Sequence, residues 1–368
     1  MNASMFRIVA GLFDESITFP GDGIGPEISR VVADVIDCLN SKLDLGIDLK
    51  EKDAGFKALE SHGTTFPADV ANEAETSDGI ILGPSDSAAY PPPEQGGINL
   101  SAAFRRKFDL FANIRPAKSW AGIKSNAPSM DMIVVRENTE GFYADRNMFT
   151  GSGEFMPTPD LALAVRKISR DGSRRIGQVA AKIASERSRQ KITIITKSNV
   201  LKLSDGLFRD ECIEAAKEYP GLEVDEIHVD AAASLFVRTP DNFDVVVTSN
   251  MFGDILSNLA NELSGGLGLG GSLNAGHNKA VAQASHGSAP DIADKNIANP
   301  SALLLSTGML FDWLAERNDS NALKEAARLI RSSMEQVFSQ SDNLTIDLNG
   351  SLGTKEFGMQ LIKKIEEL

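Results

Sequence analysis

Several basic side chains stand beside segments that are typical of buried strands. Arg105 and Arg115 lie ten residues apart in AAFRRKFDLFANIRPAK, and Arg136 follows directly on the run MDMIVV. A guanidinium group at such a position suits bidentate recognition of a carboxylate, although a surface ion pair is the alternative for each arginine taken singly. Tyr143 lies seven residues beyond Arg136, and Lys197 follows KITIIT. A lysine that leaves a buried strand either reaches solvent or is placed for proton transfer.

Two aspartates could supply oxygen ligands to a metal ion. We expect Asp230 to end the strand EIHV and Asp254, in NMFGDILSN, to lie in the first turn of a helix that follows DVVVTSN. Hard oxygen ligands from separate elements are what Mg²⁺ or Mn²⁺ requires. The alternative for Asp254 is an acid at a helix N-terminus, stabilised by the helix dipole.

The segment SHGSAPDIADKNIANP, residues 285–300, is rich in turn-forming and polar residues. One glycine and two prolines fix its turns, and its polar groups are His286, Ser288, Asp291 and Asn299. A regular helix or strand would not hold such groups on one side. The segment is therefore either a binding loop or a capped surface connection.

The turn GDGIGPE does not carry the full dinucleotide fingerprint. It reads G-x-G-x-G instead of G-x-G-x-x-G, and no acidic residue about 20 positions on ends a clear second strand. A tight strand-to-helix turn, with Pro26 in the first helical turn and Glu27 facing the helix dipole, explains it equally well.

Composition limits the classes of protein that this chain can represent. Its 368 residues are 42% hydrophobic and 24% charged, enough to bury a large core and to form about two domains. The net charge of −14 argues against nucleic acid or an anionic membrane as a partner. Cys38 and Cys212 lie in helical patterns without metal-type spacing, as expected of reduced thiols. The N-terminal run MNASMFRIVAGLF lacks a clear basic start and a convincing cleavage site, so we expect a mature, soluble, cytoplasmic protein.

Strand-like and helix-like patterns alternate along the chain. The stretch ESITFPGDGIGPEISRVVADVIDCLNSKL reads as a strand, a glycine-rich turn and a helix. The alternation returns in DGIILGPSD, MDMIVVRENTEG, KITIITKSNVLKLSDGLFRDECIEAAKEY and FDVVVTSNMFGDILSNLANEL. It predicts an α/β architecture. Pro/Gly-rich stretches at 90–97 and 265–276 bracket the middle of the chain and indicate an inserted second domain.

Taken together, the motifs resemble a known family. FPGDGIGPEI, FDLFANIRPAK, VVRENTEGFY, ITKSNVLKLSDGLF, FDVVVTSNMFGDILSNLANEL and HGSAPDIADKNIANP are similar to those of the β-decarboxylating dehydrogenases, which include isocitrate, 3-isopropylmalate, homoisocitrate and tartrate/D-malate dehydrogenases. The resemblance runs from about Ile17 to Leu310. It implies a two-domain fold with a large mixed sheet flanked by helices, not a conventional Rossmann domain. It also implies oxidative decarboxylation of a 2-hydroxy acid with a malate core, with NAD and Mg²⁺ or Mn²⁺.

The resemblance also implies a domain division and a shared active site. Residues 1–110 and 265–368 would form a large cofactor-binding domain. Residues 111–264 would form a smaller inserted domain with the dimer interface and an arm at about 139–160. In the homodimer, each active site would contain residues of both subunits.

Roles are carried over residue by residue. Arg105, Arg115 and Arg136 would bind the carboxylates of the malate core. Tyr143 matches the general acid, and Lys197 of the partner subunit the general base. Asp254 would hold the metal together with Asp230 of the partner subunit. The residues expected to contact the cofactor are Asn199, Gln283, His286, Gly287, Ser288, Ala289, Asp291, Ile292 and Asn299. NADP-linked relatives commonly have lysine and tyrosine at the positions of Asp291 and Ile292, so we expect NAD here.

Two positions depart from the commonest family pattern. Asn258 stands where the family often has a second aspartate on the metal side, four residues after Asp254. Its amide oxygen can coordinate but brings no charge. Gln283 stands where a glutamate commonly meets the nicotinamide ribose, which keeps a hydrogen bond and removes a charge.

Substrate choice in the family depends on the turn before Arg105, here GGINLSAAFR. The 3-isopropylmalate enzymes usually have leucines at the positions of Ser101 and Ala102, and homoisocitrate enzymes often have an arginine at the latter. NAD-linked isocitrate enzymes pair serine with asparagine at the positions of Asn99 and Ser101, where this chain has the two residue types reversed. A polar pocket favours isocitrate's third carboxylate over an isopropyl group. A small malate, D-malate, tartrate and 3-isopropylmalate remain alternatives, as does a non-catalytic regulatory subunit.

Overall fold

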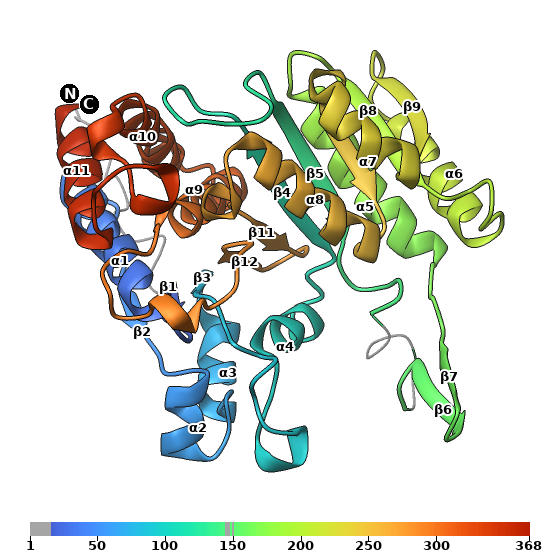
Figure 1. Cartoon of the computed structure of the whole chain (residues 1–368), viewed down its shortest axis with the longest axis horizontal. Helices are drawn as coiled ribbons and strands as arrows, with labels where there is room; N and C mark the ends of the chain where they lie inside the picture. The colour runs from blue at the N-terminus through green and yellow to red at the C-terminus, as the bar shows by residue number, and fades with distance from the viewer. Residues whose placement is uncertain (1–15, 144–147, 149–150) are drawn as a thin grey trace, which may run out of the picture.

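A ten-stranded mixed sheet runs through the molecule, with helices on both of its faces (Figure 1). The structure is a computed structural model that describes residues 16–143, 148 and 151–368. The strand order is β2-β1-β3-β12-β11-β4-β5-β10-β8-β9, and a separate two-stranded sheet pairs β6 with β7. The predicted α/β class with a large mixed sheet is confirmed.

The strands of the large sheet are short and mostly buried runs of apolar and β-branched residues, as expected where helices cover both faces. They are β1 (Ser16–Phe19), β2 (Leu49–Glu51), β3 (Gly79–Leu82), β4 (Ala112–Lys118), β5 (Asp131–Glu137), β8 (Lys191–Thr196), β9 (Glu223–His228), β10 (Val245–Thr248), β11 (Leu273–Ala275) and β12 (Ala280–Gln283).

The helices follow the apolar periodicity of the sequence; in α1, for example, Ile28, Val31, Val32 and Val35 are all buried. The α-helices are α1 (Gly25–Leu43), α2 (Phe56–His62), α3 (Ala68–Thr76), α4 (Leu100–Lys107), α5 (Arg170–Ser185), α6 (Ser204–Ala216), α7 (Val229–Arg238), α8 (Asn250–Ser264), α9 (Ser301–Asn318), α10 (Asn321–Phe338) and α11 (Thr354–Glu367). Short 3₁₀ turns include η5 (Pro290–Ile292).

Antiparallel pairing is confined to the middle of the large sheet. β11 is antiparallel to both β12 and β4, and β4 is antiparallel to β5, while the other neighbouring pairs run parallel. The register between β4 and β5 places Asn113 opposite Arg136 and Ile114 opposite Val135. Because successive side chains of a strand point to opposite faces, these two pairs lie on opposite faces of the sheet.

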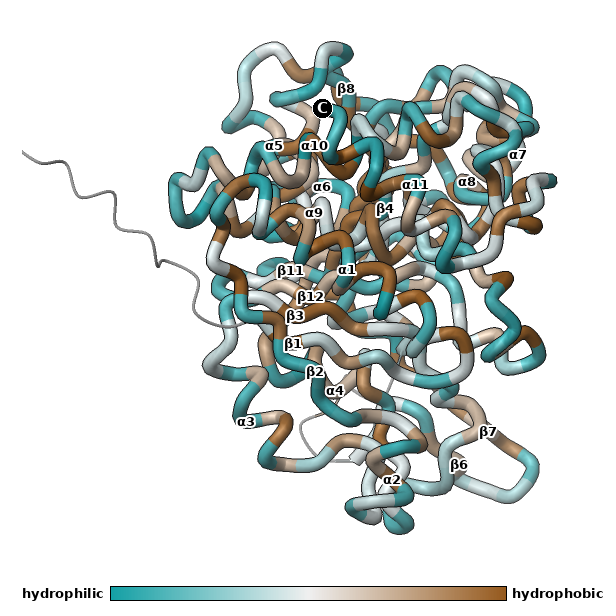
Figure 2. Tube along the Cα trace, turned by 90° about the vertical axis from the view of Figure 1, so that its left-hand side faces the viewer, coloured by the Kyte–Doolittle hydropathy of each residue, from teal (hydrophilic) through white to brown (hydrophobic). Residues whose placement is uncertain are grey.

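Separate apolar clusters fill the two ends of the sheet. At one end, α1, α9, α10 and α11 pack together and against the strands. At the other end, α5 and α6 cover one face of β5, β8 and β10, whereas α7 and α8 cover the other. Figure 2 shows hydrophobic residues concentrated in the interior, with hydrophilic ones in the peripheral loops.

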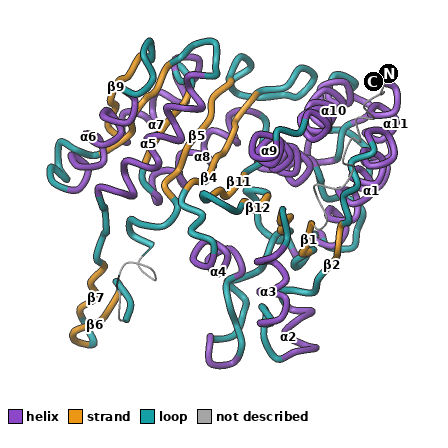
Figure 3. The backbone as a smooth tube through the Cα atoms, turned by 180° about the vertical axis from the view of Figure 1, so that it is seen from behind, coloured by secondary structure: helices purple, strands orange, loops and turns teal. Residues whose placement is uncertain are grey.

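A hairpin projects from the body of the molecule (Figure 3). It consists of β6 (Glu154–Thr158) and β7 (Leu161–Ala164), whose residues are all exposed. This hairpin extends the predicted arm beyond residue 160. Residues 144–147, 149 and 150 of the predicted arm lie outside the described residues.

Four local expectations need correction. Arg136 lies within β5, because it pairs with Asn113 on one side and with Thr248 on the other. The strand β9 ends at His228, so Asp230 lies in the first turn of α7. Asp254 is the fifth residue of α8, not a first-turn acid, because the extended residue Ser249 starts the helix earlier. The segment before Arg105 was expected to be a turn, but helix α4 begins at Leu100, so its last residues are helical.

The predicted division at residues 110/111 and 264/265 does not interrupt the sheet. β4 and β11 lie on opposite sides of that division and pair with each other through Leu273–Ile114, Asn274–Asn113 and Ala275–Ala112. The division into two domains therefore stays a prediction. Among the described residues, no helix combines the length and the apolar character needed to cross a membrane.

Candidate active site

All five predicted substrate residues line one polar pocket of about 600 Å³. It lies between α4, the strands β4 and β5, helix α8 and the segment that follows β12. The predicted residues in its lining are Asn99, Ser101, Arg105, Arg115, Arg136, Tyr143, Asp254, Gln283 and His286. Tertiary packing thus gathers side chains from positions 99 to 286 around one space large enough for a small organic acid.

Arg136 is the most deeply buried cation of the pocket, with 2% of the residue exposed. Its Nε and Nη2 donate to Asn250 Oδ1 at 3.1 and 2.7 Å, and its Nη1 lies 2.5 Å from Asp254 Oδ1. Helix α8 can approach this closely because residue 253 is glycine: a Cβ there would lie 2.6 Å from Arg136 Cγ. These bonds hold the guanidinium in one orientation.

Arg115 lies beside Arg136 on the same face of the sheet. Its Nε donates to Asn113 Oδ1 at 2.6 Å, and its Nη1 donates to Ser257 Oγ at 2.8 Å and to Asp254 Oδ1 at 3.2 Å. Burial and the charge of Arg136 lower the pKa of Arg115 to about 10, against the opposing effect of Asp254. The guanidinium therefore stays charged at neutral pH, and two buried cations share one carboxylate.

Tyr143 and Asp254 are joined by a hydrogen bond. The Tyr143 hydroxyl donates to Asp254 Oδ2 at 2.7 Å. Burial raises the pKa of Tyr143, and Asp254 raises it further, while Arg136 and Arg105 oppose the shift. Burial also acts to raise the pKa of Asp254, but Arg136 and Arg115 outweigh it and hold that pKa below its usual value. At neutral pH the pair is thus a protonated phenol and an ionised carboxylate.

Polar side chains form the wall of the pocket on the α4 side. Asn99 is the N-cap of α4: its Oδ1 accepts from the amide of Ala102 at 3.0 Å, and its Nδ2 donates to Ser87 Oγ at 3.2 Å. Ser101 and Gln283 are hydrogen-bonded side chain to side chain, with Gln283 Nε2 2.7 Å from Ser101 Oγ. A substrate substituent directed at this wall would meet hydroxyl and amide groups.

Lys197 and Asp230 are not among the described residues that line this pocket. They pair with each other, with Lys197 Nζ 2.6 Å from Asp230 Oδ1, and the Asp230 side chain is largely exposed. The structure therefore brings Tyr143 and Asp254 together and leaves Lys197 and Asp230 at a different place on the same chain.

A buried ion pair supports the turn that carries Lys197. Asp205 is 1% exposed, and its Oδ2 accepts from the backbone amide of Lys197 at 2.6 Å. Its Oδ1 lies 2.6 Å from Arg166 Nη1. The Arg166 guanidinium lies 5.6 Å from the ring centroids of both Phe142 and Phe252. Sequence reasoning missed this pair, although Asp205 stands in the quoted motif KSNVLKLSDGLF.

The donor groups for a divalent metal are incomplete within one subunit. Asp254 lines the pocket, and its two carboxylate oxygens are engaged by Arg136 and Arg115 on one side and by Tyr143 on the other. Asn258, one turn further along α8, is exposed and does not line the pocket. No cluster of three or more histidine, cysteine or acidic side chains that could hold a metal ion occurs in the described part of one chain. The donor set fits a metal only if carboxylates such as Asp230 of the partner subunit join Asp254.

A smaller cavity of about 200 Å³ adjoins the polar pocket, and His286 lines both. The predicted residues in its lining are His286, Gly287, Ala289, Ile292 and Asn299. The Nε2 atom of His286 is buried and has no hydrogen-bond partner among the described residues. Burial lowers the pKa of His286, so its ring is neutral at neutral pH. A ligand in this cavity could form a hydrogen bond with that ring nitrogen.

The segment 286–292 is anchored on the glycine-rich turn. The Ser288 carbonyl accepts from the Ile24 amide at 2.8 Å, and a Cβ at Gly23 would lie 2.0 Å from that carbonyl. The turn GDGIGPE therefore supports the loop. Asp291 lies at the rim: it is exposed, it does not line the cavity, and its carbonyl accepts from Lys295 Nζ at 2.6 Å. Asn199 is exposed and lines neither space.

Sequence analysis did not identify several residues that line the polar pocket and the small cavity. In the polar pocket they include Ser85, Ser87 and Phe142, and the groups that orient the arginines are Asn113, Asn250 and Ser257. In the small cavity they are Ile24, Gly268, Ile297 and Asp347. Asn113 is two residues before Arg115, so strand periodicity was a usable signal for it. Asp347 lies far along the chain and carried no such signal.

Fold and site together define a decarboxylating dehydrogenase, and the chain belongs to the isocitrate/isopropylmalate dehydrogenase family, whose model matches residues 16–361. The chain is 38% identical over 348 residues to the 3-isopropylmalate dehydrogenase of Methanothermobacter thermautotrophicus, which covers 95% of this chain and 97% of that protein. It is equally similar, with the same coverage, to the isocitrate/homoisocitrate dehydrogenase of Thermus thermophilus.

Solved structures agree with this assignment. The crystal structure of isocitrate dehydrogenase from Methylococcus capsulatus superposes with a TM-score of 0.84 at 34% sequence identity, and covers 95% of this chain and 99% of that one. The predicted family and the predicted enzyme class are therefore confirmed.

Proposed function

We propose that this enzyme oxidises and decarboxylates a 2-hydroxy acid with a malate core, with NAD and a divalent metal ion, and that isocitrate is its preferred substrate. The observation that carries the proposal is the arrangement of Arg115, Arg136, Tyr143 and Asp254 around one polar pocket. A site with two pre-oriented guanidinium groups suits carboxylate binding, because little side-chain entropy is lost when the ligand arrives.

Substrate carboxylates would replace Asp254 as partners of the arginines. Asp254 Oδ1 lies 2.5 Å from Arg136 Nη1 and 3.2 Å from Arg115 Nη1. Arg105 on α4 completes the basic lining of the pocket. Once substrate carboxylates neutralise the arginines, the Asp254 carboxylate becomes available to a metal ion, together with Asp230 of the partner subunit.

Two proton transfers are assigned to side chains of different subunits. Lys197 of the partner subunit removes the proton of the substrate hydroxyl, and Tyr143 later donates its proton to carbon. The raised pKa of Tyr143 keeps the phenol protonated for that step. When bound, NAD would accept the hydride, and Mg²⁺ or Mn²⁺ would polarise the oxygen on C2 and stabilise the enolate. Three buried or half-buried positive groups, on Arg105, Arg115 and Arg136, counter the negative charge of the substrate.

A homodimer with shared sites accounts for the separation of Lys197 and Asp230 from the pocket. Exposed apolar side chains, which are typical of an interface core, lie on elements near these two residues and on the arm. They include Leu203, Val237, Ile255, Met156 and Leu161. We therefore place the dimer contact on α7, α8 and the β6–β7 hairpin, within the proposed smaller domain 111–264. Residues 1–110 and 265–368 form the proposed cofactor-binding domain.

The polar wall near α4 supports isocitrate over 3-isopropylmalate. Asn99, Ser101 and Gln283 all line the pocket there. An isopropyl group offers these hydroxyl and amide groups no hydrogen bond, whereas a third carboxylate can accept hydrogen bonds from them in place of their present partners. The relative from Methanothermobacter is a 3-isopropylmalate dehydrogenase, so this substrate, with D-malate and tartrate, is the alternative.

A substrate panel tests the proposal. Purified protein is mixed with NAD and Mg²⁺ or Mn²⁺, and NADH absorbance is followed with isocitrate, 3-isopropylmalate, D-malate, tartrate or homoisocitrate. The highest kcat/KM is expected with isocitrate. Lys197→Met is the control: it should abolish turnover and leave NAD binding intact, because Lys197 moves a proton and does not hold the dinucleotide. A higher kcat/KM with another acid would overturn the substrate assignment.

A non-catalytic regulatory subunit is the second candidate. Such a chain binds ligands without turnover, and it typically lacks residues for acid, base or metal chemistry. This chain retains Tyr143, Lys197, Asp230 and Asp254, which favours the enzyme. Both cysteines are free, which is consistent with the cytoplasmic location that we propose.

A further inference from the structure

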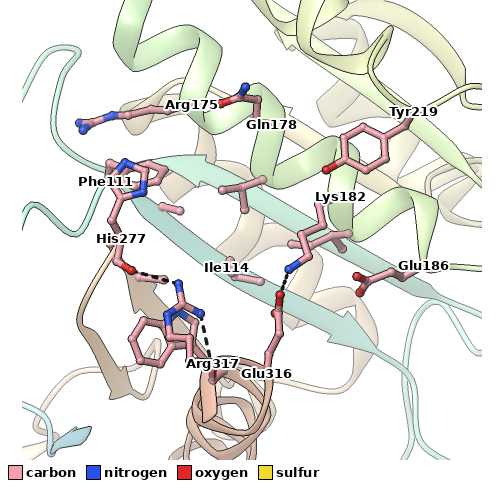
Figure 4. Close-up of a pocket in the computed structure, with 16 residues that line it drawn as sticks. Phe111, Ile114, Arg175, Gln178, Lys182, Glu186, Tyr219, His277, Glu316 and Arg317 are labelled. Atoms are coloured by element: carbon pink, nitrogen blue, oxygen red, sulfur yellow. Dashed lines mark hydrogen bonds and ion pairs between the residues drawn. The ribbon is translucent and has the colours of Figure 1, made fainter. Parts of the chain in front are cut away.

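A second pocket, of about 310 Å³, lies on the face of the sheet opposite the active site. The side chains of strand β4 show that the two pockets lie on opposite faces of the sheet. Ala112 and Ile114 line this second pocket, whereas Arg115, the next residue, lines the active site. Because side chains alternate along a strand, the two pockets lie back to back across β4. We refer to the second space as the back-face pocket (Figure 4).

The back-face pocket combines an apolar floor with a polar and aromatic rim. Its floor consists of Ala112 and Ile114 on β4 and of Val179 and Ile183 on α5. Around this floor stand aromatic and charged side chains, among them Phe111, Arg175, Lys182, Tyr219, Trp313 and Arg317. An apolar interior with a few polar groups at its edge is the usual construction of a small-molecule site.

Two helices from opposite ends of the sheet form the walls. Helix α5 packs over β5, β8 and β10, whereas α9 packs over β11 and β12. An ion pair between Lys182 on α5 and Glu316 on α9 crosses the space between them, as Figure 4 shows. The side chains of Arg175, Phe111, His277 and Arg317 lie on one side of this pair, and Tyr219 and Glu186 on the other.

The charge of the lining favours an anion. Two of the three cations in its lining already have carboxylate partners: Lys182 pairs with Glu316, and Arg175 pairs with Asp109, which lies outside the lining. Glu186, the other carboxylate of the lining, lies on the far side of the Lys182–Glu316 pair from Arg317. An anion in this pocket would therefore have Arg317 as its partner.

Arg317 is the cation that remains available for such a ligand. Its guanidinium lies 3.5 Å from the ring centroid of Trp313 and donates to the carbonyls of Trp313 and His277 at 3.4 and 3.3 Å. No carboxylate of the described part of the chain lies within ion-pair distance of it, whereas Lys182 pairs with Glu316 and Arg175 with Asp109. Burial lowers the pKa of Arg317, as expected of a guanidinium without an acidic neighbour.

We propose that the back-face pocket is a second ligand site, which takes a small organic anion with a planar, apolar body, such as an aromatic carboxylate. The carboxylate would pair with Arg317, which is already oriented by Trp313. The apolar body would lie on Ile114 between Phe111 and Trp313. Such a ligand would contact both ends of the sheet at once. The proposal does not depend on the reaction proposed for the other face, since binding is measured without substrate or cofactor.

Benzoate is the probe, and Trp313 reports its binding. The chain has two tryptophans, and Trp120 is buried against Phe338, away from this pocket. In a Trp120→Phe background, benzoate should change the fluorescence of Trp313 saturably, with a dissociation constant of roughly millimolar order for so small a ligand. Benzamide, which has the same shape and no charge, should bind at least about tenfold more weakly.

Substitutions of one arginine in each pocket show on which face of the sheet benzoate binds. Arg317→Gln should weaken benzoate binding at least about tenfold, and Arg317→Lys should lie between it and the parent protein. Arg105→Gln, which alters the active-site pocket, should leave the titration unchanged. An absent or non-saturating fluorescence change, or equal affinities of the parent and Arg317→Gln, would overturn the proposal. Loss of binding in Arg105→Gln would place benzoate in the active site and would overturn it as well.

Discussion

The ammonium group of Lys197 lies 2.6 Å from the carboxylate of Asp230, and neither residue lines the described pocket in which Tyr143 donates to Asp254. The proposed base and the proposed acid of the reaction thus occupy separate places on one subunit. A second copy of the chain is the simplest source of the missing groups in each pocket, because a symmetric dimer exchanges the same residues in both directions.

Subunit mixing tests this relationship. Lys197→Met and Tyr143→Phe should each be inactive alone. When the two are mixed and allowed to exchange subunits, about a quarter of the wild-type activity should return, because half of randomly assorted dimers are hybrids with one intact site each. Steady-state NADH formation measures the recovery. Native mass spectrometry confirms the exchange, and exchange without recovered activity would exclude the shared site.

Substitutions in α4 should change substrate preference. Ser101 and Ala102 both line the active-site pocket, and replacing both with leucine makes its wall apolar. Preference should then shift toward 3-isopropylmalate by about 10- to 200-fold in relative kcat/KM, or roughly 1 to 3 kcal/mol. The ratio of kcat/KM for isocitrate and 3-isopropylmalate, before and after substitution, measures the shift. An unchanged ratio would show that these side chains do not face the substituent.

Cofactor preference should depend on the rim of the small cavity. Ile292 lines that cavity, and Asp291 beside it is exposed. The Asp291 carboxylate can accept hydrogen bonds from the ribose hydroxyls of NAD and would repel the phosphate of NADP. The double substitution Asp291→Lys, Ile292→Tyr should therefore shift the ratio of kcat/KM toward NADP at least about tenfold, roughly 1.4 kcal/mol.

Melting temperature separates this effect from a structural one. Asp291 is exposed, and Lys295 Nζ donates to its backbone carbonyl and not to its carboxylate in the described structure. An exposed side chain without such a bond should contribute within about 0.5 kcal/mol of stability. The single variant Asp291→Lys should accordingly melt near the temperature of the wild type, and it is the one to compare, because Ile292 packs against the core. A lowered melting temperature with an unmoved cofactor ratio would mean that Asp291 only supports the turn.

Asp205 should position Lys197 although it lies away from the pocket. It holds the Lys197 amide at 2.6 Å and pairs with Arg166 at the same distance in the interior. Asp205→Asn would leave the buried Arg166 without a charged partner, at a cost of about 3 to 5 kcal/mol in the free energy of unfolding. We also expect kcat to fall while the dissociation constant for NAD stays constant.

A double variant provides the control for Asp205. Asp205→Asn combined with Arg166→Gln removes the unpaired buried charge, so it should recover part of the lost stability. Denaturant titration measures the recovery. If kcat remains low in the stabilised double variant, the ion pair positions the lysine; if kcat returns with stability, Asp205 has only a structural role.

The sequence by itself predicted the fold class and the family, and it singled out residues that line the polar pocket, because these depend on local pattern. Apolar periodicity showed the helix after GDGIGPE, and β-branched runs showed the strands before Arg136 and Lys197. The ends of strands and helices were predicted less accurately. Asp230 lies in the first turn of α7 and not at the end of a strand, and Asp254 lies beyond the first turn of α8. A strand ends where its pairing ends, and a helix starts where its first backbone hydrogen bond closes.

Only the tertiary structure decided which side chains meet. Nothing in the spacing of Asn250 and Ser257 predicts that they orient Arg136 and Arg115, because a hydrogen bond between residues more than 100 positions apart depends on the packing of α8 against β4 and β5. The ion pair of Lys182 and Glu316 across the back-face pocket is of the same kind. The sequence gives the chemical type of each side chain. The distances between side chains and their burial, which determine pKa values and hydrogen bonds, depend on how the whole chain folds.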